Sequence, residues 1–135
     1  MYKVTKTIDF CYGHRLLNYD GQCKYLHGHN GRLEIDVQSS SLDSKGMVID
    51  FTVMKDSVKS WIDSVMDHRM ILSSEDPLIP ILKQAGQPIY VLQDNPTAEN
   101  IAKHVFIQVK SSNIDVQEVR LWESPSSYAS YSEEN

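Results

Sequence analysis

Two segments near the N-terminus carry apolar side chains at alternate positions. They are residues 2–12 and 31–38, whose alternating apolar residues are Val4, Ile8 and Phe10 and then Leu33, Ile35 and Val37. Side chains two apart share one face of a strand, so both segments are predicted to be half-buried strands. The residues between them include several glycines and Asn18, which tolerate turn geometry. We therefore predict an antiparallel hairpin with a long functional connection.

Two later segments have the apolar spacing of amphipathic helices. The first is predicted at residues 51–66, with Asp50 as its N-cap. The second begins at Asn95-Pro96, a capping residue followed by proline at the first helical position, and runs to about Lys110. Their apolar stripes are Phe51, Met54, Val58, Trp61, Ile62 and Val65, and then Ala98, Ile101, Ala102, Val105 and Val109. Each helix is expected to place this stripe against a sheet.

Two further strands are predicted at residues 115–123 and, more weakly, at residues 127–132. The order of elements is then strand, strand, helix, helix, strand, strand. Two hairpins in this order can join into one antiparallel four-stranded sheet with both helices on one face, which is an α+β fold. The serine-rich end, residues 124–135, is expected to be loose beyond the last strand.

The connection between the two helices, residues 73–94, is ambiguous. Asp76-Pro77 suits the start of a short helix that ends at Gly86. Ile89-Tyr90-Val91-Leu92 suits a short extra strand. The pattern alone decides neither element.

Composition narrows the class of protein. A chain of 135 residues that is 41% hydrophobic is the size of one domain, residues 1–135. The net charge is −5 and the basic residues are scattered, which argues against a nucleic-acid partner. There is no apolar run long enough to span a bilayer, and the N-terminus lacks a signal-peptide pattern, so we expect a soluble, cytoplasmic protein. Cys11 and Cys23 do not form a CxxC pair, so a free, reactive thiol is expected rather than a disulfide.

Two histidines lie just before the second predicted strand, in His27-Gly28-His29. In extended backbone such residues point to one face about 7 Å apart, at roughly 3.3 Å per residue, so two imidazoles can converge on one ion. The hairpin brings His14 opposite this pair. Three histidines without a fourth Cys or His nearby match an open catalytic zinc site better than a closed structural one. Turn and surface histidines also arise without a metal, and His104, alone within a helix, is expected to be structural or exposed.

A thiol and an Asp-His pair are candidates for proton transfer. Cys23 stands four residues before His27, so a loop can place its sulfur beside a ligand of the metal. The charge of the metal and of Lys24 would stabilise the thiolate. In Asp67-His68, the carboxylate can orient the imidazole for proton relay. The same pair at a helix end also suits solvent contact and dipole compensation.

Seven consecutive residues, Cys23-Lys24-Tyr25-Leu26-His27-Gly28-His29, resemble the CxxxHGH signature of bacterial 6-carboxytetrahydropterin synthases, relatives of 6-pyruvoyltetrahydropterin synthase. Further segments are similar in type and order to landmarks of this family: Phe10 to Leu16 to its first metal-ligand segment, Gly46 to Phe51 to its strand-to-helix junction, Met66 to His68 to its Asp-His motif, Asn95 to Asn100 to the start of its second helix, and Trp122 to Ser124 to its terminal Glu motif. The resemblance spans most of the chain, and such an ordered set is far more specific than any single motif.

The resemblance implies a tunnelling fold, in which ββααββ subunits assemble into oligomeric barrels, commonly hexamers, with active sites at subunit interfaces. It also implies conversion of 7,8-dihydroneopterin triphosphate to 6-carboxy-5,6,7,8-tetrahydropterin, with release of acetaldehyde and triphosphate, towards queuosine and other deazapurines. In this interpretation His14, His27 and His29 hold Zn²⁺, which acidifies carbon–hydrogen bonds of the substrate.

The resemblance further implies roles for single side chains. Cys23 would act as general base, and Asp67 with His68 would complete the proton relay, from a neighbouring subunit if the site lies between copies. Glu123 would bind the pterin, since a carboxylate offers two acceptors for the amino group and the adjacent ring N–H. Thr97 and Glu99 are candidates for further ring contacts, although helix capping explains both equally well. Arg15 and Lys24 are candidate triphosphate contacts, with ordinary solvated charge as the simpler interpretation.

Two departures from the family pattern leave alternatives open. Residues 73–94 make a longer connection than in compact bacterial enzymes, and Cys11-Tyr12-Gly13 replaces a small, often alanine-containing stretch. One alternative is a 6-pyruvoyltetrahydropterin synthase, which has a longer spacing between the cysteine and the histidines. A folate-type relative carries glutamate near the position of Cys23. An alternative of another class is a non-catalytic, zinc-stabilised binding protein, which chelation would unfold.

Overall fold

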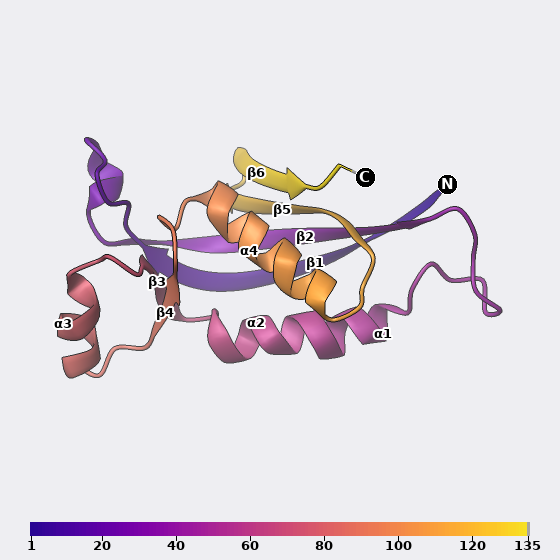
Figure 1. The fold of residues 1–135 in the computed structure, drawn as a ribbon, viewed down its shortest axis with the longest axis horizontal. Helices are drawn as coiled ribbons and strands as arrows, with labels where there is room; N and C mark the ends of the chain where they lie inside the picture. Colours follow the sequence, from indigo (N-terminus) through magenta and orange to yellow (C-terminus); the bar gives the residue numbers. More distant parts are fainter. Residues whose placement is uncertain (135) are drawn as a thin grey trace.

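A computed structural model describes residues 1–134 of the chain. Six strands form one sheet: β1 (Tyr2–His14), β2 (His27–Ser39), β3 (Arg69–Ser73), β4 (Ile89–Leu92), β5 (Val116–Ser124) and β6 (Ser127–Ser132). The helical elements are a 3₁₀ turn (Gln22–Lys24), α1 (Phe51–Met54), a π-helical turn (Lys55–Lys59), α2 (Ser60–Val65), α3 (Leu78–Gln84) and α4 (Ala98–Ser111). The first long helix therefore runs through α1, the π turn and α2 without a break (Figure 1).

The strand order is β4-β3-β1-β2-β5-β6. The predicted hairpin is confirmed, because β1 pairs antiparallel with β2 along its whole length, from Tyr2 opposite Ser39 to His14 opposite His27. The predicted antiparallel sheet of four strands was wrong in its number of strands and in their directions. Two further strands are present: β3 pairs parallel with β1, and β4 pairs parallel with β3. The sheet is thus six-stranded and mixed, and α3 is a further helix beyond the two expected.

The missed strand, β3, has a sequence that carries little strand signal. It is only five residues long, and Ile71, Leu72 and Ser73 are buried in succession. A strand that is covered on both faces does not alternate between apolar and polar residues, so the period-two pattern is absent. Both elements considered for residues 73–94 are present, as α3 and β4. The weak strand expected at 127–132 is β6. The serine-rich end, which was predicted to be loose, therefore belongs to the sheet as far as Ser132. Residue 135 lies outside the described part.

The second long helix begins later than the sequence predicted. Thr97 is its N-cap, and its side chain accepts a hydrogen bond from the backbone N–H of Asn100 at 3.1 Å. Asn95 instead bonds both backbone groups of Leu17, at 2.9 and 3.1 Å. The amide that looked like a helix cap therefore fastens the connection that follows β1.

One face of the sheet is apolar and the other is charged. The helices α2 and α4 lie along the apolar face (Figure 1), where Ile8, Leu33 and Ile35 are almost completely buried. On the other face, Arg120 donates two hydrogen bonds to Asp36, at 2.7 and 2.8 Å, and Asp36 is only 1% exposed. This ion pair ties β2 to β5. In the described part of the chain, no helix is long and apolar enough to cross a membrane.

Replacing Arg120 by Met is expected to destabilise the fold by about 3 kcal/mol, because the buried Asp36 carboxylate loses its two charged hydrogen bonds and keeps only Thr5 and the more distant Lys3. Urea denaturation measures the change. The matched control is Arg32→Met, which breaks an exposed pair with Asp9 on the same face and should change stability little. Equal effects of the two substitutions would contradict this assignment.

Candidate functional site

Three imidazoles meet where the long hairpin ends at its loop. His14, His27 and His29 each offer one ring nitrogen, and these three atoms lie within 4.8 Å of one another. The Nε2 atoms of His14 and His29 are 3.1 Å apart. Two nitrogens bound tetrahedrally to one zinc ion at about 2.0–2.1 Å would lie roughly 3.3 Å apart, so the rings are already close to the geometry of shared coordination.

Two backbone carbonyls hold these rings with Nε2 towards the cluster. The Nδ1 of His14 lies 2.7 Å from the carbonyl oxygen of Pro96, and the Nδ1 of His27 lies 2.7 Å from that of Tyr25. A carbonyl only accepts, so each Nδ1 carries the proton and each Nε2 keeps a free lone pair. This is the arrangement by which proteins orient metal-binding histidines.

Burial keeps His14 neutral. The side chain is in the core, at 2% exposure, and burial lowers its pKa to about 4, with its bond to Pro96 acting in the opposite direction. A metal competes with protons for the imidazole lone pair. At neutral pH His14 is therefore available to a metal without first losing a proton.

A carboxylate stands beside one of the three histidines. The Oε2 of Glu123 is 3.9 Å from the Nε2 of His29. Glu123, Thr97 and Glu99 line one cavity of about 710 Å³, which lies between the start of α4 and the β5–β6 turn. The structure thus brings together, around one cavity, the three residues that the sequence nominated for contacts with a ring, and one of them, Glu123, lies next to His29.

Cys23 lies in the 3₁₀ turn between β1 and β2 and is half-buried. Its carbonyl accepts a hydrogen bond of 2.8 Å from the N–H of Leu16, two residues after His14. The loop is therefore closed at its base, and Cys23 is held near the end of the hairpin where His14 faces His27.

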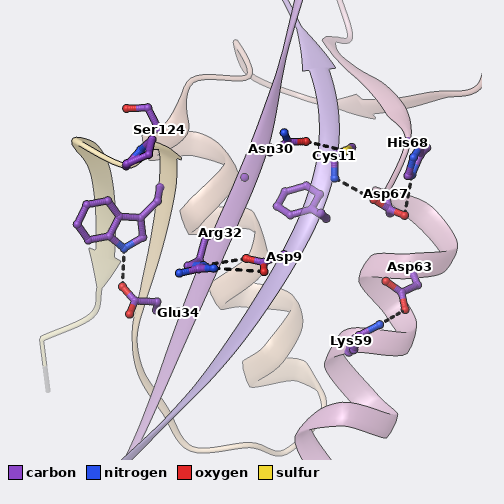
Figure 2. A pocket seen from close by; sticks show the side chains of 14 residues that line it. Asp9, Cys11, Asn30, Arg32, Glu34, Lys59, Asp63, Asp67, His68 and Ser124 are labelled. Atoms are coloured by element: carbon purple, nitrogen blue, oxygen red, sulfur yellow. Dashed lines mark hydrogen bonds and ion pairs between the residues drawn. The ribbon is translucent and has the colours of Figure 1, made fainter.

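Asp67 and His68 lie beside β1, immediately before β3 (Figure 2). Asp67 accepts from the backbone N–H of Cys11 at 2.9 Å and bonds the Nδ1 of His68 at 2.8 Å. Both residues line a cavity of about 920 Å³ on the charged face of the sheet. Hydrogen bonds from Cys11 and His68 hold the pKa of the Asp67 carboxyl below its usual range, against the effect of burial.

The pair and the three histidines are oriented to different sides of the hairpin. Tyr12 and His29 are opposite each other on the helix-covered side, and alternation turns the neighbouring Cys11 and Asn30 to the other side. His68 shares the wall of a cavity of about 520 Å³ with Cys11 and Asn30, and His27, Gly28 and His29 border the same cavity. Within one chain, the relay pair therefore faces the charged side while the imidazoles cluster on the helix side.

The two candidate triphosphate contacts are placed differently from each other. Arg15 donates two hydrogen bonds to Asp76, at 2.8 and 2.5 Å, and the Asp76 carboxylate is fully buried. Lys24 lies with its ammonium 5.3 Å from the centre of the Tyr25 ring. Arg15 thus ties the loop after β1 to the start of α3, while Lys24 stays at the surface.

His104 is the expected structural histidine. It lies on α4, with its Nε2 2.6 Å from the hydroxyl of Tyr90 on β4, and burial lowers its pKa.

The unfolded chain binds a proton at His104 below a pH of about 6.5, whereas the folded chain binds it only at lower pH. The free energy of unfolding should therefore decrease as the pH falls below about 6.5. In His104→Gln, which keeps an acceptor for Tyr90, urea titrations from pH 7.5 to pH 5 should show a weaker decrease; an unchanged pH dependence would contradict this.

Sequence reasoning missed two parts of the site. The Pro96 carbonyl that orients His14 is a backbone group, so no side-chain pattern announces it. Tyr12 packs between two of the histidines, with ring centres 5.3 Å from His14 and 5.5 Å from His29. Its position two residues before His14, on the same face of the strand, was the signal that could have identified it.

A group of three histidines, beside a cavity with a carboxylate, is typical of metal enzymes that keep a coordination position for substrate. The sequence profile of the family described as 6-pyruvoyl tetrahydropterin synthase matches residues 3–134. The chain therefore belongs to the 6-pyruvoyl tetrahydropterin synthase family.

Named relatives and solved structures agree with this membership. The chain is 41% identical over 135 residues to the 6-carboxy-5,6,7,8-tetrahydropterin synthase of Rickettsia conorii, covering 95% of this chain and 98% of the relative. The enzyme of the same name from Haemophilus influenzae is 33% identical over 141 residues, covering 98% and 100%. A crystal structure of a protein from Wolinella succinogenes is similar with a TM-score of 0.81 at 27% identity, covering 98% of each chain. The 6-pyruvoyl tetrahydropterin synthase of Caenorhabditis elegans shares the fold, with a TM-score of 0.74 at 21% identity over 98% of this chain and 96% of that one.

Proposed function

We propose that this chain is a zinc-dependent 6-carboxytetrahydropterin synthase, a lyase that converts 7,8-dihydroneopterin triphosphate to 6-carboxy-5,6,7,8-tetrahydropterin with release of acetaldehyde and triphosphate, on the way to queuosine and related deazapurines. The observation that carries the proposal is the meeting of His14, His27 and His29 beside the Glu123 cavity. The names of the relatives in Rickettsia and Haemophilus support the carboxy-forming reaction.

The donor set fits zinc. Imidazole nitrogens are ligands that zinc prefers, and three neutral ones leave its positive charge uncancelled. Zinc bound there would supply Lewis-acid charge that makes carbon–hydrogen bonds next to the substrate's side-chain hydroxyls more acidic. The carbonyls of Pro96 and Tyr25 keep the imidazoles turned towards the ion.

Cys23, Glu123 and the pair Asp67-His68 then have separate tasks. Glu123 binds the ring, since its two oxygens match the ring's amino group and the adjacent N–H, while Thr97 and Glu99 border the same cavity. Cys23 takes up the proton from the acidified carbon, as general base. His68, oriented by Asp67, returns or removes protons at the substrate side chain.

We further propose that copies of the chain assemble and complete one another's sites. Three features favour an assembly in which a neighbouring copy supplies Asp67-His68: the charged sheet face, the edge strands β4 and β6, and the orientation of this pair away from the imidazole cluster.

Mixing inactive Cys23→Ala and inactive His68→Ala proteins should then restore part of the activity after subunit exchange. A mixture that stays inactive would contradict shared sites.

The product identifies the reaction. Purified protein with zinc and 7,8-dihydroneopterin triphosphate should release acetaldehyde and yield a pterin with the mass of the carboxy compound. The mass of a pyruvoyl product would instead assign a 6-pyruvoyltetrahydropterin synthase, and a pterin cleaved at its side chain a folate-type enzyme. The absence of any conversion would contradict the proposal.

A further inference from the structure

Tyr12 has a buried hydroxyl without a partner. The side chain is 3% exposed, and its hydroxyl is the one buried side-chain polar atom in residues 1–134 that makes no hydrogen bond. Burying a hydroxyl without a hydrogen bond is unfavourable, and phenylalanine would fill the same space without this cost. An unsatisfied buried hydroxyl of this kind needs an explanation, and a hydrogen bond that forms only when a ligand is bound would supply it.

The ring of Tyr12 spans the sheet from β1 towards Glu123. It stacks on Phe10, with ring centres 5.0 Å apart, and lies over Gly31 of β2. A Cβ at Gly31 would lie 2.8 Å from the ring, so only glycine leaves room for it there. The next residue, Arg32, pairs with Trp122 of β5, which places Glu123 on the neighbouring strand beside Gly31.

The charge of Glu123 suits the Tyr12 hydroxyl. A phenol can donate a hydrogen bond and a carboxylate only accepts, and the register places Glu123 opposite the Gly31 on which the Tyr12 ring lies. Glu123 itself is at the irregular end of β5, where the pairing with β6 shifts register after Trp122, and its side chain is 31% exposed.

We propose that Tyr12 is a positioning residue for Glu123: when a pterin occupies the cavity, the Tyr12 hydroxyl donates a hydrogen bond to the Glu123 carboxylate. The remaining lone pairs of the carboxylate then face the two N–H donors of the ring. This inference rests on the proposed function for the identity of the ligand. Its physical effect is to fix the carboxylate in the bound state: the donor is held rigidly by the core, and the new bond offsets part of the freedom that a long, partly exposed side chain loses on binding.

Tyr12→Phe tests the role directly. Its KM for 7,8-dihydroneopterin triphosphate should rise about tenfold and its kcat should change less than about twofold, since a lost binding contact acts on both ground and transition states. The dissociation constant for neopterin, measured by fluorescence, should rise by a similar factor. Metal content should stay at the wild-type level, and the midpoint of thermal unfolding should not fall, because the hydroxyl has no partner in the free protein.

A double-mutant cycle separates positioning from general packing. In a Glu123→Ala background, Tyr12→Phe should have no further effect on neopterin affinity, because the hydroxyl acts through the carboxylate. Tyr90→Phe, which removes a hydroxyl bonded to His104 away from the site, should leave both KM and neopterin affinity unchanged.

The contrary results are equally definite. Unchanged KM and neopterin affinity in Tyr12→Phe, additive effects with Glu123→Ala, or loss of the fold in Tyr12→Phe would each overturn the role of Tyr12. If the wild-type protein binds neopterin but does not convert the triphosphate, the proposed reaction fails, and the affinities of the variants still decide the role of Tyr12. If it does not bind neopterin, both proposals fail.

Discussion

Replacing Cys23 by Ala is expected to lower turnover by about 10²–10⁴-fold while the fold and the metal content stay at wild-type levels, because general base catalysis contributes a factor of that order. The thiol is held in a short turn whose carbonyl bonds Leu16, so removal of the sulfur leaves the backbone contacts intact. Steady-state kinetics, circular dichroism and metal analysis on one preparation measure the three quantities.

Cys11 supplies the matched control. It is the other free cysteine, also half-buried, but its sulfur donates to Asn30 on the charged face at 2.9 Å. Cys11→Ala should keep most of the activity. A Cys23→Ala protein with full turnover would rule out the thiol as base and would return the non-catalytic, zinc-stabilised protein to consideration.

Replacing His29 by Ala should reduce turnover by at least about a thousandfold and lower metal affinity by more than about a hundredfold, since it removes one of three ligands whose orienting contacts alone are worth 10–100-fold. His29 is partly exposed, so the loss of its ring should leave the core intact, unlike a change at the buried His14. Competition with a chelator of known affinity measures the metal affinity.

The control for this substitution is His104→Gln, which changes a histidine that bonds Tyr90 and lies in none of the three cavities at the site. It should bind metal as the wild type does. Equal metal affinity in the His29→Ala and wild-type proteins would mean that the imidazoles do not hold the ion together.

The sequence predicted that three histidines meet because two regular patterns carry them. Strand alternation places His27 and His29 on one face, and a hairpin between two alternating segments must bring His14 near them; the register confirms this, with His14 opposite His27. Glu123, Thr97 and Glu99 came from the family resemblance, and the structure places all three around one cavity. Their roles remain predictions until the variants are measured.

The parts that were missed depend on contacts between distant segments. β3 has no alternation because it is buried. The contacts of residues 73–94 could not be predicted either. Asp76, near the start of this connection, bonds Arg15, and Asn95, just after its end, bonds Leu17, so both fasten the loop that carries Cys23. A sequence does not distinguish a charged residue that pairs across the fold from one that binds a phosphate. Arg15 was therefore a candidate triphosphate contact, and its pairing with Asp76 could not be predicted.

Tyr12 shows the same limit at the site itself. An aromatic residue in a strand is ordinarily a core residue, and Tyr12 is one. Only the lack of a partner for its hydroxyl, together with the glycine that makes room for its ring, sets it apart from Phe10. Neither fact can be obtained from the spacing of apolar residues.

X-ray absorption at the zinc edge, on protein purified with zinc, tests the central claim most directly. The account predicts one zinc per chain with three imidazole nitrogens at about 2.0–2.1 Å, no sulfur in the coordination shell, and a remaining oxygen donor. A sulfur ligand at about 2.3 Å would mean that Cys23 is bound to the metal and is not a free base. A preparation that binds no zinc would contradict the metal centre itself.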